Sequence, residues 1–117
     1  EMIQPVISLH LRDIDLGFND NVTGNIQLFS VCSNLESIQL IRTRVNGDLK
    51  AFEKCHELRK IGLGATQATG DISVLRNCKF LESMDFGSTE VTGNISMLSK
   101  LNNIQYILLG VTKVKGD

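Results

Sequence analysis

Apolar residues return along the chain every 23 residues from Leu35 onward, and the same pattern begins at Leu11 in a repeat that is one residue longer. Each repeat opens with an apolar position, followed by a second three residues later and a third two residues after that. These three columns are Leu11, Leu35, Leu58, Leu81 and Ile104; Ile14, Ile38, Ile61, Met84 and Ile107; and Leu16, Leu40, Leu63, Phe86 and Leu109. Spacing by two predicts a short strand with one buried face. Repetition at this period predicts a solenoid whose coils bury their apolar sides against each other.

The second half of each repeat carries a polar column, a turn signal and a return segment. The polar column is Thr43, Thr66, Thr89 and Thr112, followed two residues later by Val45, Ala68, Val91 and Val114. A glycine column comes next, at Gly24, Gly47, Gly70, Gly93 and Gly116, and Asp or Asn follows each glycine. The glycines predict a turn that needs positive φ or close backbone approach. Apolar residues then recur every three positions, which favours a short helical or 3₁₀ segment over a second long strand.

The pattern LxxLxL, then T-x-V-x-G-[DN]-[IL], resembles the leucine-rich-repeat family, and most closely its plant and protist members. The resemblance covers residues 11–117. It implies an α/β fold: a right-handed, curved solenoid with one short parallel strand per coil on the concave face and short helical, 3₁₀ or irregular segments on the convex face. In this chain Thr replaces the Asn that forms the family's buried side-chain ladder. Because a Thr hydroxyl can also bond to neighbouring backbone, we expect that ladder to persist in altered form.

The repeats divide the chain without a linker or a separate catalytic module. We expect a single solenoid segment over residues 1–117, in which residues 1–10 form part of a coil. Complete coils follow at residues 11–34, 35–57, 58–80 and 81–103, and residues 104–117 form a shortened one. Neither end has a polar capping element of the kind that open solenoids need, so we interpret the chain as a piece of a longer array.

The net charge and the lengths of the apolar runs exclude some classes of partner. The net charge of −1 gives no electrostatic reason to expect nucleic acid or an anionic membrane as a partner. No apolar run approaches the ~20 residues that span a bilayer, so we expect no membrane insertion. Nothing in the sequence indicates a cofactor, and we expect no enzymatic activity.

Candidate chemical motifs all have simpler structural explanations. Cys32, Cys55 and Cys78 share one column with Leu101, which indicates small apolar core positions instead of a metal site. Unpaired cysteines slightly favour a cytoplasmic location, although buried thiols also survive outside the cell. His10 and His56 lack a third group to complete a catalytic arrangement, and the glycines of residues 62–64 do not continue into a phosphate-binding motif. Asn21 and Asn94 match the glycosylation pattern, which leaves modification open.

The family resemblance implies that partners bind the concave face, and the strand alternation predicts which side chains line it. The candidates are Asp13, Asp15, Ser37, Gln39, Ile41, Lys60, Ser83, Asp85, Tyr106 and Leu108. Tyr is favoured at binding hot spots, so Tyr106 with Leu108 is the best predicted anchor. These two residues could instead pack against a further coil.

We therefore predict a non-enzymatic recognition module that binds a protein or peptide on its concave face. One alternative is the sensor or substrate-binding arm of a larger receptor kinase or ubiquitin ligase, which rests on family analogy. Another is a structural spacer without a ligand, since glycines are numerous on the predicted face. The oligomeric state is left open.

Overall fold

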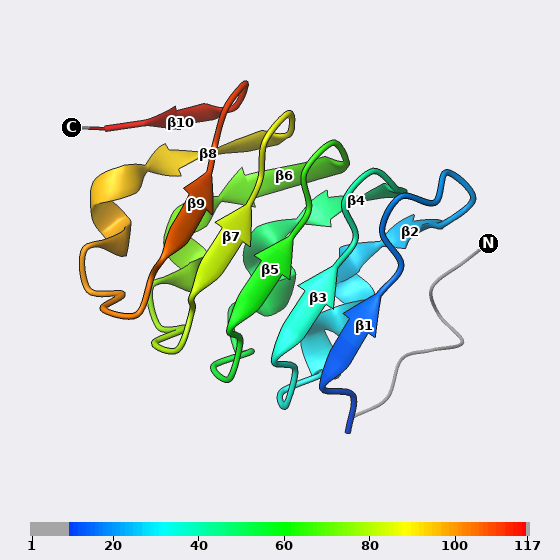
Figure 1. The fold of residues 1–117 in the computed structure, drawn as a ribbon, viewed down its shortest axis with the longest axis horizontal. Helices are drawn as coiled ribbons and strands as arrows, with labels where there is room; N and C mark the ends of the chain where they lie inside the picture. The colour runs from blue at the N-terminus through cyan, green and yellow to red at the C-terminus, as the bar shows by residue number, and fades with distance from the viewer. Residues whose placement is uncertain (1–9, 117) are drawn as a thin grey trace.

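Two parallel sheets run along the molecule, and each coil contributes one strand to each of them (Figure 1). The structure, a computed structural model, describes residues 10–116. The first sheet comprises β1 (Asp13–Asp15), β3 (Ser37–Gln39), β5 (Lys60–Gly62), β7 (Ser83–Asp85) and β9 (Tyr106–Leu108). The second comprises β2 (Thr23–Asn25), β4 (Arg44–Asp48), β6 (Gln67–Asp71), β8 (Glu90–Asn94) and β10 (Lys113–Lys115). The predicted part-coil spans residues 1–10, of which residues 1–9 lie outside the described residues.

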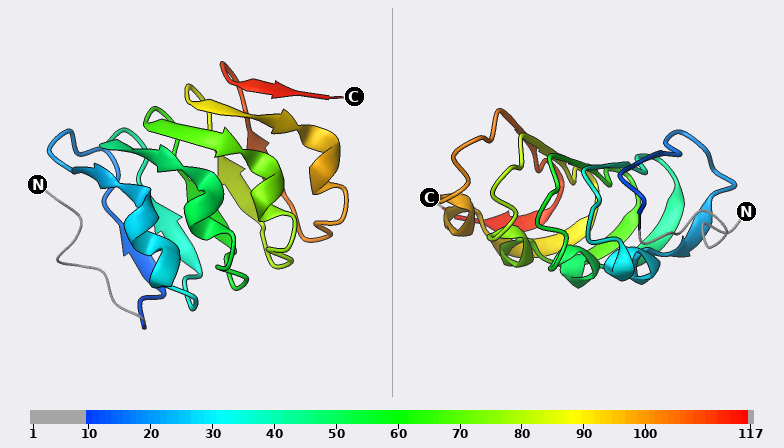
Figure 2. Two further views of the ribbon diagram at one scale, coloured as in Figure 1. Left: turned by 180° about the vertical axis from the view of Figure 1, so that it is seen from behind. Right: turned by 90° about the horizontal axis from the view of Figure 1, so that it is seen from below.

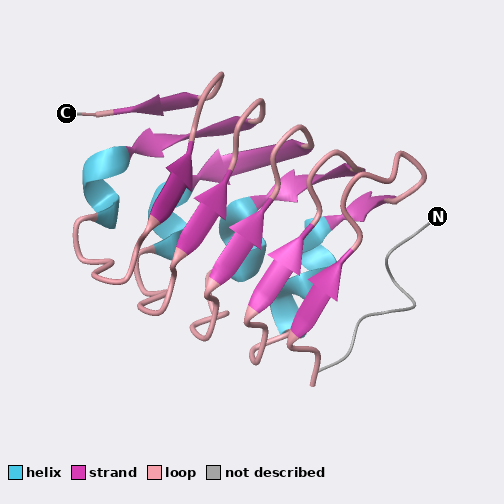
Figure 3. Cartoon of the chain, viewed as in Figure 1, coloured by secondary structure: helices cyan, strands magenta, loops and turns pink. Residues whose placement is uncertain are grey.

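Short 3₁₀ helices follow the strands of the second sheet, as the spacing by three predicts (Figure 3). They are η2 (Ile26–Val31), η3 (Leu49–Phe52), η4 (Ile72–Leu75) and η5 (Ile95–Leu98). The view along the strands in Figure 2 shows that the stack is curved, with the first sheet on the concave side and the 3₁₀ helices on the convex side. The predicted concave sheet and helical return segments are therefore confirmed.

The core is a continuous layer of apolar side chains between the two sheets and the helices. The columns identified in the sequence supply it, and in the inner coils they are fully buried, as at Leu35, Leu58 and Leu81. Phe29 and Phe52 stack with ring centroids 6.3 Å apart, which continues the packing from η2 to η3. Because each coil buries its apolar side against its neighbours, the coils depend on one another for stability.

The second sheet is absent from the sequence prediction, which placed only one strand in each coil. Its strands come from the T-x-V-x-G segment, where Thr43 and Val45 are buried while Arg44 and Asn46 are exposed. That alternation is a period-two signal, but Gly47 after it indicated a turn. Glycine in fact lies inside β4, β6 and β8, and the turn occurs elsewhere.

The chain turns from the first sheet to the second at a non-glycine residue with positive φ. This residue has φ of 59°, 57°, 54°, 57° and 56° in the five coils, at Phe18, Arg42, Ala65, Ser88 and Val111 respectively. The backbone N–H of each of the first four donates to a carbonyl of the next coil, as from Ala65 to Gly87 O at 2.8 Å. The inter-coil ladder thus holds a conformation that L-residues seldom adopt.

The threonine column closes this turn locally and forms no ladder between coils. The Thr66 hydroxyl donates to Leu63 O at 2.5 Å, and Thr43 and Thr89 repeat this bond to Leu40 and Phe86. The expectation of a modified ladder is wrong for these bonds, because the short Thr side chain reaches a carbonyl three residues back in its own coil. It therefore satisfies a buried turn carbonyl.

The glycine column has a packing function that becomes clear between adjacent coils. The Asp48 carboxylate caps η3 by accepting the Lys50 N–H at 2.8 Å. Gly70 of the following coil lies against this cap, where a Cβ atom would be 2.8 Å from Asp48 Cγ and 2.9 Å from Leu49 N. The same conflict would arise between Gly47 and Asn25 and between Gly93 and Asp71. Close stacking of the coils therefore requires glycine opposite each Asx cap.

Replacing Gly70 with Ala is expected to lower the free energy of unfolding by about 1–3 kcal/mol, because the new Cβ meets the Asp48 cap at a φ of 103°. Urea unfolding followed by circular dichroism measures the change. Gly110→Ala is the matched control: a Cβ there has no atom within 4 Å, so its effect is expected within about 0.5 kcal/mol. Equal losses in the two variants would contradict the packing explanation.

Candidate functional site

The outward side chains of the first sheet form two straight rows across five strands. Parallel pairing places Ser37 beside Lys60 and Gln39 beside Gly62, and the other strands continue the same register. One row is Asp13, Ser37, Lys60, Ser83 and Tyr106; the other is Asp15, Gln39, Gly62, Asp85 and Leu108. Nine of the ten predicted site residues therefore lie in these rows, and Ile41 lies two residues beyond the end of β3.

These side chains differ in how far they are exposed to solvent and therefore accessible to a partner. Tyr106 and Leu108 at one end are 54% and 42% exposed, which is high for large apolar side chains. Asp13, Asp15 and Lys60 are exposed as well, whereas Ser37, Gln39, Ile41, Ser83 and Asp85 are half-buried. The face thus has an acidic end at β1 and an apolar end at β9.

The centre of the face is lined with glycine and covered by neighbouring side chains. Gly62 and Gly64 are buried. A Cβ at Gly62 would collide with the side-chain amide of Gln39, and one at Gly64 would lie 2.7 Å from Asp85 Oδ1. Asp85 Oδ1 also accepts the Gly87 N–H at 3.0 Å, which fixes the carboxylate on the sheet. Glycine here lets two polar side chains lie flat, which the sequence alone did not reveal.

Gln39 carries an unmet hydrogen-bonding capacity on this face. Its Oε1 is buried and receives no hydrogen bond from the described residues. Most buried side-chain polar atoms have a partner, and an unpartnered one costs free energy. A donor supplied from outside the chain would therefore be favourable beside Gln39.

A further row, the positive-φ turn residues, borders the face along the carboxyl ends of its strands. Phe18 and Val111 in this row are 73% and 84% exposed, and the Arg42 guanidinium carbon lies 5.8 Å from the Phe18 ring centroid. The predicted site residues do not include this row, although the strand alternation already places it just past the outward positions. Each of its residues lies three positions beyond the end of a strand, as Phe18 does after Asp15.

The face does not assemble catalytic or metal-binding groups within the described range. Asp15 and Asp85 lie on strands three steps apart, about 14 Å at the usual strand spacing, which exceeds the separation of a glycosidase carboxylate pair. Among residues 10–116 no group of three or more His, Cys, Asp or Glu side chains could hold a metal ion.

The cysteine column is buried core. The Cys55 thiol donates to Cys32 O at 3.5 Å, and the Cys78 thiol donates to Cys55 O at the same distance. Burial, with smaller contributions from Cys78 and Cys32, raises the pKa of Cys55 from 9.0 to about 12. Burial likewise raises the pKa of Cys78 to about 11. These thiols are therefore protonated and poor nucleophiles at neutral pH.

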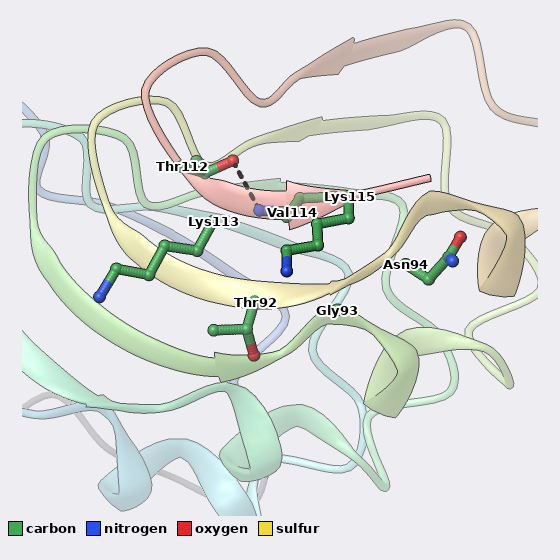
Figure 4. A pocket seen from close by; sticks show the side chains of 7 residues that line it. All are labelled: Thr92, Gly93, Asn94, Thr112, Lys113, Val114 and Lys115. Carbon is green, nitrogen blue, oxygen red and sulfur yellow. Dashed lines mark hydrogen bonds between the residues drawn. The ribbon is translucent and has the colours of Figure 1, made fainter. Parts of the chain in front are cut away.

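A hollow of about 810 Å³ lies at the outer edge of the second sheet, beside β10 (Figure 4). Backbone and side chains of β8 and β10 line it, including Thr92, Asn94, Lys113 and Lys115. β10 is the last strand of its sheet, with β8 as its neighbour. The hollow is thus an open sheet edge, and the first sheet remains the better candidate site.

Solved structures with the same arrangement are numerous, although no family model and no curated protein matches the sequence. The ectodomain of the receptor kinase SOBIR1 from Arabidopsis thaliana, described as LRR, is 20% identical with a TM-score of 0.79, over 91% of this chain and 60% of that one. A TDR receptor is 28% identical with a TM-score of 0.78, and the alignment covers 89% of this chain and 18% of the receptor. The chain has a leucine-rich-repeat fold.

A third similar structure is the plant peptide hormone receptor RGFR1 in complex with RGF2, which is 17% identical with a TM-score of 0.63. The alignment covers 97% of this chain and 22% of the receptor. The chain thus spans less than two thirds of the length of all three proteins. The predicted solenoid class is confirmed, including its curvature and parallel strands. No helix within residues 10–116 is long and apolar enough to cross a membrane.

The raised thiol pKa values predict a pH dependence of stability. In the unfolded chain the thiols ionise near 9.0, whereas in the folded chain they stay protonated to about 11 or 12. Their contribution is therefore complete well below pH 9 and is lost as pH rises, by up to about 1.4 kcal/mol per pH unit for each thiol between pH 9 and 11. Urea unfolding at several pH values measures the slope.

The double variant Cys55→Ala, Cys78→Ala is the control for that slope. It is less stable at pH 7 because it loses buried volume, but its free energy of unfolding should fall less steeply between pH 9 and 11. Parallel curves for the two proteins would contradict the assignment of the slope to these thiols.

Proposed function

We propose that the chain is a non-enzymatic recognition module that binds a protein or peptide segment on the outward face of the first sheet. The observation that supports this most is the alignment of exposed side chains from five coils in two rows, ending at Tyr106 and Leu108. A concave, regular surface of this kind can contact an extended segment over several residues. The three similar solved structures are described as receptors or as the ectodomain of a receptor kinase, and one of them is a plant peptide hormone receptor in complex with RGF2.

Tyr106 and Leu108 are the proposed anchors. They are adjacent outward side chains of β9, so they share one face. Tyr contributes a large contact area at low entropic cost and is enriched at interface hot spots. Both side chains are exposed, so a partner on this face can reach them.

The charge of the face supports a partner segment that carries basic side chains. Asp13, Asp15 and Asp85 contribute three carboxylates, against the single ammonium of Lys60. Asp85 uses Oδ1 to hold Gly87, which orients the carboxylate before a partner arrives. Complementary charge increases the association rate and discriminates among partners. The unpartnered Gln39 Oε1 adds an acceptor for a backbone or side-chain donor.

Two alternatives remain with distinct support. The sensor arm of a larger receptor gains support from SOBIR1, which is described as a receptor kinase. In that alternative the partner binds the same face, so it differs from the proposal only in the domains that flank the repeats. A spacer without a ligand predicts instead that no substitution on the face alters binding.

Selection of peptides from a displayed random library, followed by calorimetry on the selected sequences, tests the proposal. We expect peptides with basic and apolar residues whose affinity falls by about 2 kcal/mol, roughly thirtyfold, in Tyr106→Ala with Leu108→Ala. The matched control is Met97→Ala, another exposed apolar side chain, which lies on η5 of the convex side. Loss of binding in the control, or unchanged binding in the double variant, would contradict the assigned face.

Asp85→Asn separates charge from structure in the same assay. The Asn side chain can still accept the Gly87 N–H, so the fold is retained while the charge is removed. We expect weaker binding of basic peptides and a smaller dependence on salt. Unchanged affinity and salt dependence would indicate that the carboxylates do not contribute.

A further inference from the structure

A separate groove on the molecule carries three cations. It has a volume of about 610 Å³ and lies between the loops that precede β7 and β9. These two loops run along the lower edge of the ribbon in Figure 1. Arg76, Lys79 and Phe80 line it from one loop, and Lys100, Asn102 and Asn103 from the next, together with Asn77. Its size is within the range of small-ligand pockets. No carboxylate is among the lining residues.

None of the three cations is neutralised within the described chain. The ion pairs found between residues 10 and 116 join Arg12 to Glu36, Arg59 to Glu82 and Lys113 to Glu90. Glu82, which lies two residues beyond Phe80, is held by Arg59 at 3.1 Å. Glu57 lines a neighbouring hollow that shares Lys79 and Phe80. In a chain of net charge −1, this groove is therefore a local concentration of positive charge.

The repeats provide an internal comparison. The corresponding groove between the first two coils contains Arg12 and Lys54, but also Glu36 and Glu57. Its charges balance, and Arg12 lies 3.8 Å from Glu36. The same architectural groove is thus neutral in one place and wholly cationic in another. The repeat geometry creates the groove, and its residues set the charge.

Two of the lining residues are oriented by the fold. An Arg76 guanidinium N–H donates to Ser73 O at 3.1 Å, which leaves its other N–H groups available. The Asn103 amide donates to Lys79 O at 3.4 Å and so ties the two loops together. Held donors lose less entropy when an anion binds.

Phe80 supplies the second chemical feature. Its side chain is 43% exposed at the groove, and Arg59 lies over its ring at 5.7 Å from the centroid. An exposed aromatic ring beside cations can stack with a planar ring while the cations bind an attached oxyanion. The three Asn amides can both donate to and accept from polar ring atoms.

We propose that this groove binds a free mononucleotide, that is, a phosphate monoester of a sugar that also carries a planar base. Arg76, Lys79 and Lys100 bind the phosphate, and Phe80 stacks with the ring. Arg is suited to bidentate phosphate recognition, and Lys adds point charges. This site is independent of the first-sheet face, so either can fail without the other.

Calorimetric titration with AMP, adenosine and inorganic phosphate, each at low salt, tests the proposal. We expect saturable AMP binding that is at least tenfold tighter than binding of adenosine or phosphate. Lys79→Gln with Lys100→Gln should weaken AMP binding at least tenfold, whereas Lys54→Gln in the neutral groove should leave it unchanged. Absence of saturable AMP binding, or equal effects of the two substitutions, would overturn the proposal.

Two further measurements test whether Phe80 stacks with the base and whether the phosphate belongs to a free nucleotide or to an oligonucleotide. Phe80→Leu should weaken AMP binding several-fold and leave phosphate binding unchanged; no effect on AMP would overturn the stacking role. A short single-stranded oligonucleotide should bind no more tightly than AMP, because the groove is confined to two loops. Much tighter binding of the oligonucleotide would overturn the assignment to a free nucleotide.

Discussion

Each coil packs closely against the preceding coil because a glycine of one lies against the Asx residue that caps the 3₁₀ helix of the other. Asp48 must hold its carboxylate at the start of η3, and the next coil can approach only if position 70 lacks a side chain. The constraint recurs from coil to coil and keeps the strands at hydrogen-bonding distance on both sheets. A solenoid has few contacts between distant repeats, so its regularity depends on such nearest-neighbour interfaces.

Because other positions hold the coils together, the outward residues of the first sheet can differ from coil to coil. The apolar columns, the caps and the glycines are used for stacking, whereas the outward strand positions carry Asp, Ser, Lys, Gln, Tyr and Leu in successive coils. The same principle operates at the lower edge, where equivalent grooves differ in charge because their loops differ. Rigid repeats with variable surface positions are well suited to recognition, because binding side chains are positioned before the partner arrives.

Most of the architecture was predictable because it depends on periodicity. Leu35, Leu58 and Leu81 identify the core column directly, and the spacing by three after the glycine identifies the 3₁₀ helices. The second sheet was not predicted, because Gly47 inside a strand has the same local signature as a glycine in a turn. The true turn at Ala65 was missed, because inter-coil hydrogen bonds, which have no local sequence signal, hold it at positive φ. Strand alternation predicted which residues lie on the concave face. It did not predict that Gln39 and Asp85 lie over Gly62 and Gly64, because that depends on packing between strands of different coils.

A double-mutant cycle on Asp48 and Gly70 tests the interlock of the coils most directly. Asp48→Ala removes both the cap and the carboxylate atoms that a Cβ at position 70 would meet, and leaves only the contact with Leu49 N, so Gly70→Ala should cost less in that background. We expect a coupling of about 1 kcal/mol or more in the free energy of unfolding, measured by urea denaturation. Losses that add to within about 0.3 kcal/mol would show that cap and glycine act independently, and would contradict the account.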